Sequence, residues 1–290
     1  MNVLSLFSGV GGLDLGLERA GFSTVYQCEW DPKASAVLEK HWPDVPRWGD
    51  VSTLTAKEIL SHGKFPDVVA WGSPCQDLSL VGKKSGLSGS KSGLFHEGMR
   101  IINELREETD GQYPKVSIWE NVANALSSNK GEDFGVILDE MAGAGALVCE
   151  WAVLDALFFG VPQRRRRVFL VSVFDSGFAE KCSGEILPVQ ESHQGHRVKN
   201  RYFTFYSTQG KQDKFTKNFA TTLKAVSAVC VGGSGVRPRK LTPVECERLM
   251  SWPDGWTAGQ ADTHRYRQCG NGVVSNVAEW VGRRLLEVTA

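Results

Sequence analysis

Short apolar runs alternate with helix-like segments over the first 175 residues of the chain. The apolar runs predict buried strands at residues 3–7, 25–28, 68–71, 116–119 and 168–173. Apolar residues at helical spacing predict helices at 13–20, 33–41, 98–107 and 134–144 between them. Strands that alternate with helices in this way indicate an α/β fold, in which a parallel sheet carries helices on both faces.

The pattern changes after residue 174 and returns near residue 237. Between these points only short strand-like pieces, such as 202–206, occur among Gly, Ser and Lys. Thr242 and Glu245 then form a capping box, with Pro243 at the first position of a helix that runs to 250. A final helix is predicted by one apolar face, which consists of Val273, Val277, Val281 and Leu285. We therefore expect one domain built from residues 1–174 and 237–290, with residues 175–236 inserted as a small, mostly irregular or β domain.

Composition is that of an ordinary globular protein. The chain has 290 residues, of which 41% are hydrophobic and 23% charged, and this excludes a disordered or low-complexity protein. It has no apolar run long enough to span a bilayer, and residues 1–7 lack the basic region of a signal peptide, so we expect a cytoplasmic protein. Seven scattered cysteines without a Cys-x-x-Cys pair indicate neither a disulfide framework nor a zinc site, and we expect most of them to be buried thiols and at most one to take part in chemistry.

The zero net charge conceals an uneven distribution. Residues 161–240 contain fifteen basic and five acidic side chains, a net charge of +10, which leaves −10 for the rest of the chain. Such a segment is typical of a surface that binds a polyanion, and nucleic acid is the favoured one. A solvated loop region rich in lysine is the alternative interpretation.

A glycine-rich turn, Phe7-Ser8-Gly9-Val10-Gly11-Gly12, joins the first predicted strand to the first helix. Glycines at this position let the backbone approach a ligand, and Glu29, twenty residues past Gly9, can accept hydrogen bonds from ribose hydroxyls. Asp14 stands where a dinucleotide fingerprint has its third glycine, which counts against NAD. S-adenosyl-methionine, which has no pyrophosphate, fits the turn better. A simple tight turn remains the alternative.

Three further groups follow predicted strands. Gly72-Ser73-Pro74-Cys75-Gln76-Asp77 puts a thiol at the carboxyl end of a strand, where open α/β sheets bind ligands, although a lone cysteine is more often a core residue. Glu120 and Asn121 end the next strand, where a glutamate can also cap a helix. The run 163–167, Gln-Arg-Arg-Arg-Arg, enters the strand at 168–173, and alternation predicts that Arg165 and Arg167 point the same way. A solvated face or a localisation signal would also explain this run.

In this order the groups resemble the motifs of the DNA cytosine 5-methyltransferases of bacteria and phages, over nearly the whole chain except about 175–220. The segments 239–253 and 270–273 resemble the family's motifs after its target recognition domain. Leu78 and Gly272 depart from the family, which usually has Phe and a Ser or Ala there. The resemblance implies a Rossmann-like S-adenosyl-methionine-dependent methyltransferase domain, with a target recognition domain at 175–236.

The resemblance also implies a role for each site residue. Cys75 would attack carbon 6 of a flipped-out cytosine, Glu120 would bind N3, Arg165 would orient the base edge and Glu120, and Arg167 would support these groups. The catalytic set is Pro74, Cys75, Gln76, Glu120, Asn121, Arg165 and Arg167. The S-adenosyl-methionine pocket would comprise Phe7, Ser8, Gly9, Val10, Gly12, Glu29, Trp30, Asp50, Val51, Pro74, Asn271 and Gly272. Contacts to DNA are expected from Lys83, Lys84 and Ser85 of a Gly- and Lys-rich catalytic loop at 80–93, and from Arg164 and Thr222.

The partners that follow are a duplex DNA substrate and a companion restriction endonuclease, and we expect a monomer that needs no membrane. Two alternatives stay open. A tRNA cytosine 5-methyltransferase shares the nucleophile and the acid, although Gln76 and Asp77 after Cys75 favour the DNA enzymes. A catalytically inactive DNA-binding relative would keep the fold without the reaction, and the presence of Cys75, Glu120 and Arg165 argues against it.

Overall fold

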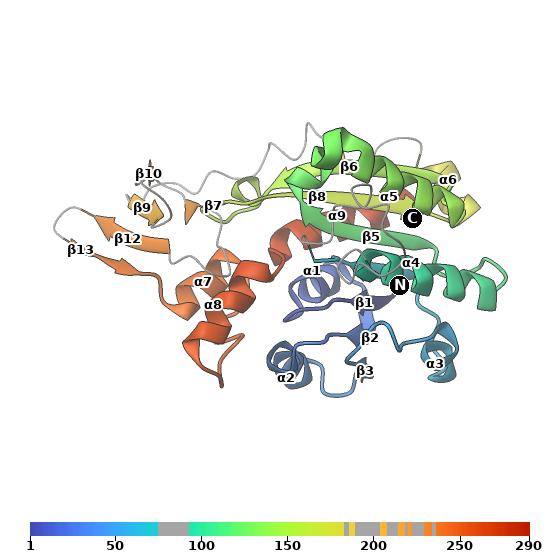
Figure 1. Ribbon diagram of the computed structural model, residues 1–290, viewed down its shortest axis with the longest axis horizontal. Coiled ribbons are helices and arrows are strands. Elements are labelled where there is room, and N and C mark those ends of the chain that lie inside the picture. Colours follow the sequence, from blue (N-terminus) through green and yellow to red (C-terminus); the bar gives the residue numbers. More distant parts are fainter. Residues whose placement is uncertain are drawn as a thin grey trace.

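The computed structural model describes residues 1–74, 93–182, 186–188 and 239–290, together with the backbone of strands at 204–207, 214–217, 220–221, 229–233 and 236–238. In this part of the chain the core is a seven-stranded sheet of strand order β3-β2-β1-β4-β5-β8-β6 (Figure 1). Its strands are β1 (Asn2–Leu6), β2 (Ser23–Cys28), β3 (Arg47–Trp48), β4 (Val68–Trp71), β5 (Val116–Val122), β6 (Val148–Asp155) and β8 (Arg166–Val173).

The sheet is mixed, so the expectation of an all-parallel sheet was wrong at one edge. β1 to β5 are parallel to one another, but β8 lies between β5 and β6 and is antiparallel to both. A strand buried on both faces is a continuous apolar run whatever its direction, and therefore the sequence of β8 does not reveal its orientation. β6 was not predicted, because this edge strand combines apolar residues with Glu150 and the exposed Trp151.

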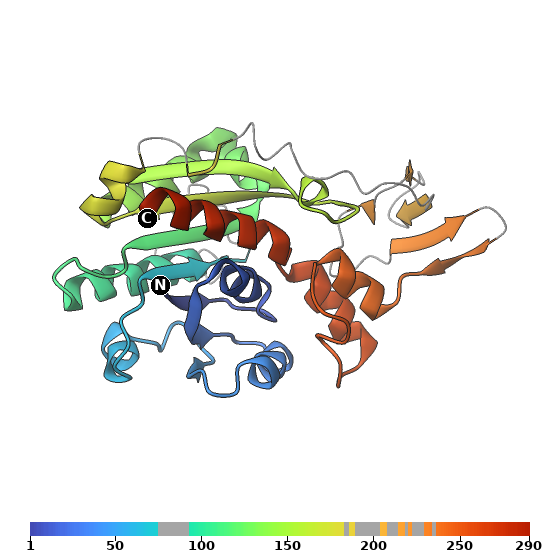
Figure 2. The ribbon, with the colours of Figure 1, turned by 180° about the vertical axis from the view of Figure 1, so that it is seen from behind.

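Helices cover both faces of the sheet, as predicted. One face carries α1 (Gly12–Ala20), α2 (Pro32–His41) and α9 (Ser275–Thr289), and the other α3 (Ala56–Ser61), α4 (Gly93–Glu108) and α5 (Glu132–Gly143). Figure 2 shows α1 and α9 in front of the sheet. α6 (Ser176–Lys181) packs at the end of α9, where Lys181 Nζ donates to the Thr289 and Ala290 carbonyl oxygens. α9 begins at Ser275, so Val273 precedes the helix to which its spacing had assigned it.

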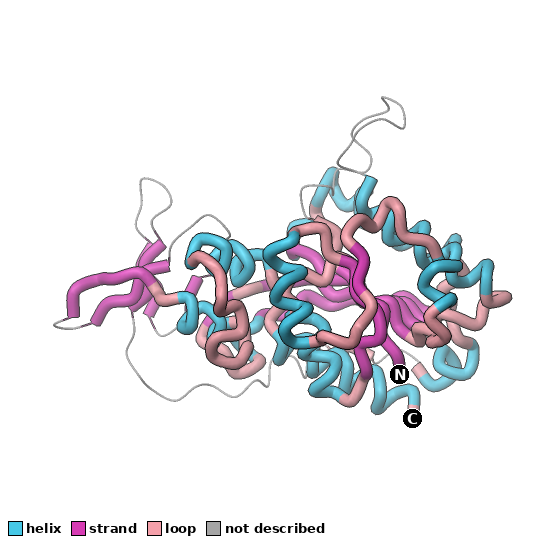
Figure 3. The backbone as a smooth tube through the Cα atoms, turned by 90° about the horizontal axis from the view of Figure 1, so that it is seen from below, coloured by secondary structure: helices cyan, strands magenta, loops and turns pink. Residues whose placement is uncertain are grey.

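The short helical turns η3 (Ala123–Leu126), η4 (Ser128–Gly131) and η5 (Ala156–Phe158) follow β5 and β6. A second sheet, of order β10-β9-β12-β13, lies at one end of the molecule (Figure 3). It consists of β9 (Thr204–Ser207), β10 (Lys214–Lys217), β12 (Val229–Gly233) and β13 (Val236–Lys240), while β11 (Ala220–Thr221) pairs with β7 (Gln163–Arg164). The β character expected for the insertion is therefore present in its described strands.

Two helices, α7 (Pro243–Leu249) and α8 (Asp262–Asn271), connect this second sheet to α9. The predicted capping box at the start of α7 is present: Thr242 Oγ1 accepts from the Glu245 amide, and Glu245 Oε2 accepts from the Thr242 amide. α8 was not predicted, because most of its residues are polar and leave no apolar stripe.

Four of the five cysteines that the structure describes are buried free thiols: Cys28, Cys182, Cys246 and Cys269. Among the described residues, none of the helices is long and apolar enough to cross a membrane.

The crossing of α1 and α9 depends on Gly16. A Cβ atom at this position would lie 2.4 Å from the Ser275 carbonyl oxygen and 2.5 Å from the Ala278 Cβ. The two helix backbones therefore touch where Gly16 has no side chain. At the start of α1, Ser275 Oγ donates to the Gly12 carbonyl oxygen at 2.7 Å, and the crossing thereby fixes the end of the glycine-rich turn.

We predict that Gly16→Ala lowers the free energy of unfolding by roughly 1–3 kcal/mol, because the added methyl group overpacks the crossing. Gly135→Ala in α5 is the matched control, since no atom lies within 4 Å of the Cβ it would add. That change should stabilise the protein by up to about 1 kcal/mol through helix propensity. Urea unfolding of both variants measures the difference, and equal effects would contradict the proposed close approach.

Candidate active site

The glycine-rich turn between β1 and α1 has a tightly held backbone. Phe7, Gly9 and Gly11 have positive φ angles of 55°, 58° and 79°, which is rare for a residue such as Phe7 and is found at functional sites. Ser8 donates its amide hydrogen to the Cys28 carbonyl oxygen at 3.1 Å. The Gly9 amide donates to Glu29 Oε2 at 2.7 Å. The turn is thus fixed to the end of β2.

Glu29 connects this turn to the start of α2. Its Oε1 accepts from the Asp31 amide at 2.8 Å, and burial raises the pKa of its carboxyl group. Next to it, Trp30 is 74% exposed, the highest value among the large apolar side chains described. Asp50 Oδ1 accepts from the amide and hydroxyl of Ser52, and Val51 is buried beside it. Carboxylates and an open aromatic ring suit a ligand with hydroxyl groups and a flat base.

Asp14 lies beneath the turn as part of a buried polar network. Its two oxygens accept from the Ser5 hydroxyl and the Gln27 amide, each at 3.0 Å. Gln27 in turn accepts from Arg47. Burial raises the pKa of Asp14 to about 6. The sequence showed Asp14 only as a departure from the dinucleotide fingerprint, whereas the structure shows that it supports β1 and β2 below the turn.

Glu120 lies near the end of β5, at the carboxyl edge of the parallel strands. Its Oε1 lies 3.2 Å from Arg167 Nε. Burial raises the pKa of Glu120, while the positive charges of Arg167 and Arg165 oppose this rise. Gly72 leaves room for the carboxyl group, because a Cβ there would lie 3.3 Å from Glu120 Oε2.

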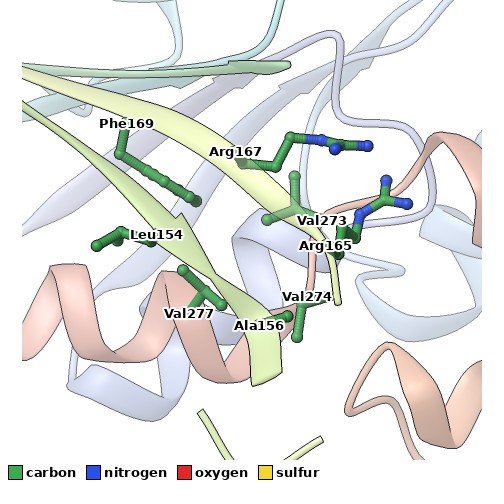
Figure 4. A pocket seen from close by; sticks show the side chains of 8 residues that line it. All are labelled: Leu154, Ala156, Arg165, Arg167, Phe169, Val273, Val274 and Val277. Carbon is green, nitrogen blue, oxygen red and sulfur yellow. The ribbon is translucent and has the colours of Figure 1, made fainter. Parts of the chain in front are cut away.

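Arg167 reaches Glu120 because β8 is antiparallel to β5. The register pairs Val122 with Arg167, so the start of β8 lies beside the end of β5. Figure 4 shows both guanidinium groups reaching to the same side, around a pocket with Leu154, Phe169 and Val277. Arg165 Nη2 also donates to the carbonyl oxygens of Gly270 and Gly272, which flank Asn271. Burial lowers the pKa of Arg165 to about 9, so the side chain still carries its charge at neutral pH.

Asn121 supports the segment that leads to Cys75. Its Nδ2 donates to the Ser73 carbonyl oxygen at 2.9 Å, and Trp119 Nε1 donates to the Ser73 hydroxyl at 3.3 Å. Ser73 was not among the expected site residues, and no sequence signal distinguished it from its neighbours. Pro74 is the last residue described before Cys75.

One pocket joins the glycine-rich turn to Glu120. It holds about 410 Å³ of empty space, part of it open to solvent, and is lined by Ser5, Leu6, Phe7, Ser8, Gly9, Gly12, Leu13, Gly72, Glu120, Asn271, Gly272 and Val273. These residues come from five separate parts of the sequence. A ligand in the turn would therefore lie next to the buried carboxyl group.

Of the residues expected to contact DNA, Arg164 is the one that the structure describes. It lies on β7, largely exposed, with its Nε 3.8 Å from Asp155 Oδ2. Cys75, Gln76, Lys83, Lys84, Ser85 and Thr222 lie outside the described residues, as do Leu78 and the loop up to residue 92.

Two tryptophans that were not predicted as site residues contact the glycine-rich turn. Trp256 Nε1 donates to the Val10 carbonyl oxygen at 2.8 Å, and the ring of Trp252 fills the space beside Gly12 and Gly272. Both lie between α7 and α8, far from the turn in sequence. No sequence signal indicated what they contact.

Comparison with known proteins first identifies the fold as that of a methyltransferase. The structure of S. pombe Dnmt2 methyltransferase superimposes with a TM-score of 0.72 over 99% of this chain and 98% of that one, at 18% sequence identity. At such an identity the likeness concerns the fold alone.

The sequence comparisons identify the family. Type II methyltransferase M2.BsuMI of Bacillus subtilis (strain 168) is 34% identical over 98% of this chain and 75% of its own length. Type II methyltransferase M.HhaI of Haemophilus parahaemolyticus is 29% identical over 97% of this chain and 93% of its own. The family model for C-5 cytosine-specific DNA methylase matches residues 1–200 and 180–287. The chain belongs to the C-5 cytosine-specific DNA methylase family, which confirms the resemblance stated above.

We predict a pH-dependent difference in stability between the wild type and Glu120→Gln. Because burial raises the pKa of Glu120 above its usual 4.5, protonated Glu120 favours the folded state. This contribution is complete below the unfolded-state pKa and is lost as pH rises through the folded-state pKa. The free energy of unfolding of the wild type, relative to Glu120→Gln, should therefore fall as the pH rises above 4.5. Urea unfolding across this range measures it, and a constant difference would contradict the raised pKa.

Proposed function

We propose that this chain transfers a methyl group from S-adenosyl-methionine to carbon 5 of a cytosine in duplex DNA. The observation that carries the proposal is the single pocket that connects the glycine-rich turn to Glu120. A methyl donor bound at the turn and a base bound at Glu120 would meet there. The family and the relatives, which are type II methyltransferases, support this reaction.

The residues present fit S-adenosyl-methionine. Glu29 offers carboxylate oxygens for the ribose hydroxyls, Asp50 can accept from the adenine amine, and the exposed Trp30 ring can cover the adenine. Phe7, Ser8, Gly9 and Gly12 line the pocket together with Asn271 and Gly272. Val10, Val51 and Pro74 adjoin these groups. When bound, S-adenosyl-methionine supplies an electrophilic methyl group on a sulfonium.

Carbon 5 of cytosine is a poor nucleophile, so the ring must be activated first. The Cys75 thiolate forms a bond to carbon 6, which makes the base an enamine that attacks the methyl carbon. The bound donor would supply this methyl group, and its sulfur would keep the electron pair of the carbon–sulfur bond. A proton acceptor then removes the proton from carbon 5, and the Cys75 thiolate leaves carbon 6. These two steps restore the aromatic ring. The base must leave the helical stack to enter this pocket.

Glu120 assists the addition at N3 of the cytosine. Its raised pKa favours a protonated carboxyl group that can donate to N3 as negative charge develops there. Arg167 Nε lies 3.2 Å from Glu120 Oε1 and thereby orients the carboxyl group. Arg165 fixes the turn that contains Asn271, and Asn121 with Ser73 positions the segment before Cys75. Gln76 follows the nucleophile as part of its motif.

The insertion at 175–236 is proposed to read the DNA sequence. Its excess of basic residues suits phosphate contacts, and β11 pairs with β7 next to Arg164, close to the catalytic edge of the sheet. The first part of this range, α6 and Ile186–Leu187, packs on the large sheet, so the described β strands are the better candidates for reading bases. Lys83, Lys84 and Ser85 would contact DNA from the catalytic loop, and Thr222 from the insertion.

The type II relatives are bacterial enzymes, which supports action on DNA in a bacterial or phage-infected cytoplasm and a companion restriction endonuclease. We propose a monomer, since the pocket is assembled from this chain alone. Sedimentation of the purified protein with and without duplex DNA tests this state.

Cys75→Ser should abolish methyl transfer while leaving the affinity for S-adenosyl-methionine largely unchanged, because the thiol acts on the base. Tritiated methyl transfer to duplex DNA measures activity, and calorimetry measures cofactor binding. Cys149→Ser is the matched control. Cys149 lies on the edge strand β6, away from the pocket, and its thiol is 3.5 Å from the Ser172 hydroxyl. This variant should stay active. Turnover above about one per cent of wild type in Cys75→Ser would contradict the assignment of the nucleophile.

Duplex DNA and tRNA carrying 5-fluorocytosine distinguish the substrate classes. The DNA should form a covalent adduct that survives denaturation, because fluorine cannot leave as a proton does and the elimination stalls. An adduct with tRNA alone would support the tRNA alternative, and no adduct with either would support an inactive relative. Bisulfite sequencing of DNA from cells that express the protein then identifies the methylated site.

Glu120→Gln should reduce methyl transfer by roughly 100- to 10,000-fold, since an amide can still hydrogen-bond at N3 but donates no carboxylic proton. The loss should appear in kcat measured at saturating DNA and cofactor. An unchanged kcat would show that Glu120 takes no part in proton transfer.

A further inference from the structure

The segment from α7 to α8 contacts the cofactor side of the large sheet at several points. Lys40 Nζ donates to the Gly255 carbonyl oxygen at 3.3 Å, and the His41 ring stacks on Trp256 at 3.5 Å between centroids. Trp256 also binds the Val10 carbonyl oxygen of the glycine-rich turn. In Figures 1 and 2, α7 and α8 accordingly lie beside α1 and α2.

A further contact joins residues that are 236 positions apart in sequence. Arg267 Nη2, on α8, lies 2.5 Å from Asp31 Oδ2 at the start of α2. The other oxygen of Asp31 accepts from the Lys33 amide and caps α2, so the carboxylate is already oriented when Arg267 meets it. Both side chains are partly exposed, at 45% and 32%.

This ion pair joins two parts of the wall of the proposed cofactor pocket. Asp31 is held through its amide by Glu29, whose other oxygen binds Gly9, so Asp31 belongs to the part of the wall that carries Glu29 and Trp30. Arg267 lies one helical turn before Asn271, which lines the same pocket as Gly9. Movement of α8 away from Asp31 would therefore separate these two parts of the wall.

The contacts between the two parts of the wall differ in how readily they break. The Trp256–Val10 hydrogen bond is buried, so breaking it would leave polar groups unsatisfied. The Arg267–Asp31 pair is open to water, which solvates both charges when they part. The buried hydrogen bond is therefore the more costly of the two contacts to break, and the partly exposed ion pair the less costly.

We infer that Arg267 and Asp31 form a latch that retains S-adenosyl-methionine in its pocket. Arg267 is a positioning residue, since it touches neither the base nor the reacting methyl group. The inference rests on the proposed function for its ligand. The latch closes when the ion pair forms and must open for the cofactor and its demethylated product to exchange.

Arg267→Gln should raise the Kd for S-adenosyl-methionine about 2- to 5-fold, the range expected for an exposed ion pair, mainly through faster dissociation. The effect should shrink at about 1 M salt, where exposed charges are screened. Calorimetry and stopped-flow tryptophan fluorescence with the full chain measure these values. The KM for S-adenosyl-methionine should rise with Kd, while kcat at saturating cofactor stays unchanged.

Asp31→Asn is the second variant, because asparagine keeps the helix cap but not the charge. It should weaken binding as much as Arg267→Gln, and the double variant should be no weaker than either single one. Arg267→Lys should restore part of the affinity. Arg248→Gln is the matched control: it removes an equally short, exposed ion pair with Asp254 in the same segment, and cofactor affinity should not change.

Unchanged cofactor affinity and dissociation in Arg267→Gln, with unfolding midpoints equal to wild type, would overturn the latch. So would equal losses in Arg248→Gln, or additive losses in the double variant. The proposed function has a separate test, since the wild type alone must bind S-adenosyl-methionine and methylate DNA. Wild-type activity with no difference between variants therefore rejects the latch and leaves the function intact.

Discussion

A buried carboxyl group at the end of β5 is the constraint on which the site depends. An isolated charge at Glu120 would be costly in this environment, and the structure responds with a raised pKa and two nearby arginines. Arg167 reaches it only because β8 runs antiparallel to β5, and Gly72 leaves the space that the carboxyl group fills. The reversed strand at the edge of an otherwise parallel sheet thus has a direct consequence for the chemistry.

The same arginines link the two halves of the pocket. Arg165 binds the carbonyl oxygens on either side of Asn271, so the base side and the cofactor side share a side chain. The glycine at position 272, where the family usually has Ser or Ala, also has a physical explanation. A Cβ there would lie 2.6 Å from the Trp252 ring, so the serine or alanine usual in the family would collide with this tryptophan. Gly272 therefore leaves the space that the Trp252 ring occupies.

Much of the fold and site was predictable because the relevant signals are local. Apolar runs placed β4 at the observed residues, a proline and two capping side chains placed α7, and glycines marked the turn before α1. The candidate residues Glu29, Glu120 and Arg167 were found because each follows or precedes a predicted strand at the edge where such folds bind ligands. The edge strand β6 and the polar helix α8 escaped prediction, since neither has a clear apolar periodicity.

The sequence by itself determined the class of fold, the family and the types of chemical group available, because motifs and periodicity are properties of neighbouring residues. Only the tertiary structure decided which groups meet. The direction of β8, the pairing of Arg167 with Glu120, and the contacts of Trp256 with Val10 and of Arg267 with Asp31 join positions that are 47 to 246 residues apart. No local pattern records such pairs, since they arise from packing the whole sheet and its helices at once.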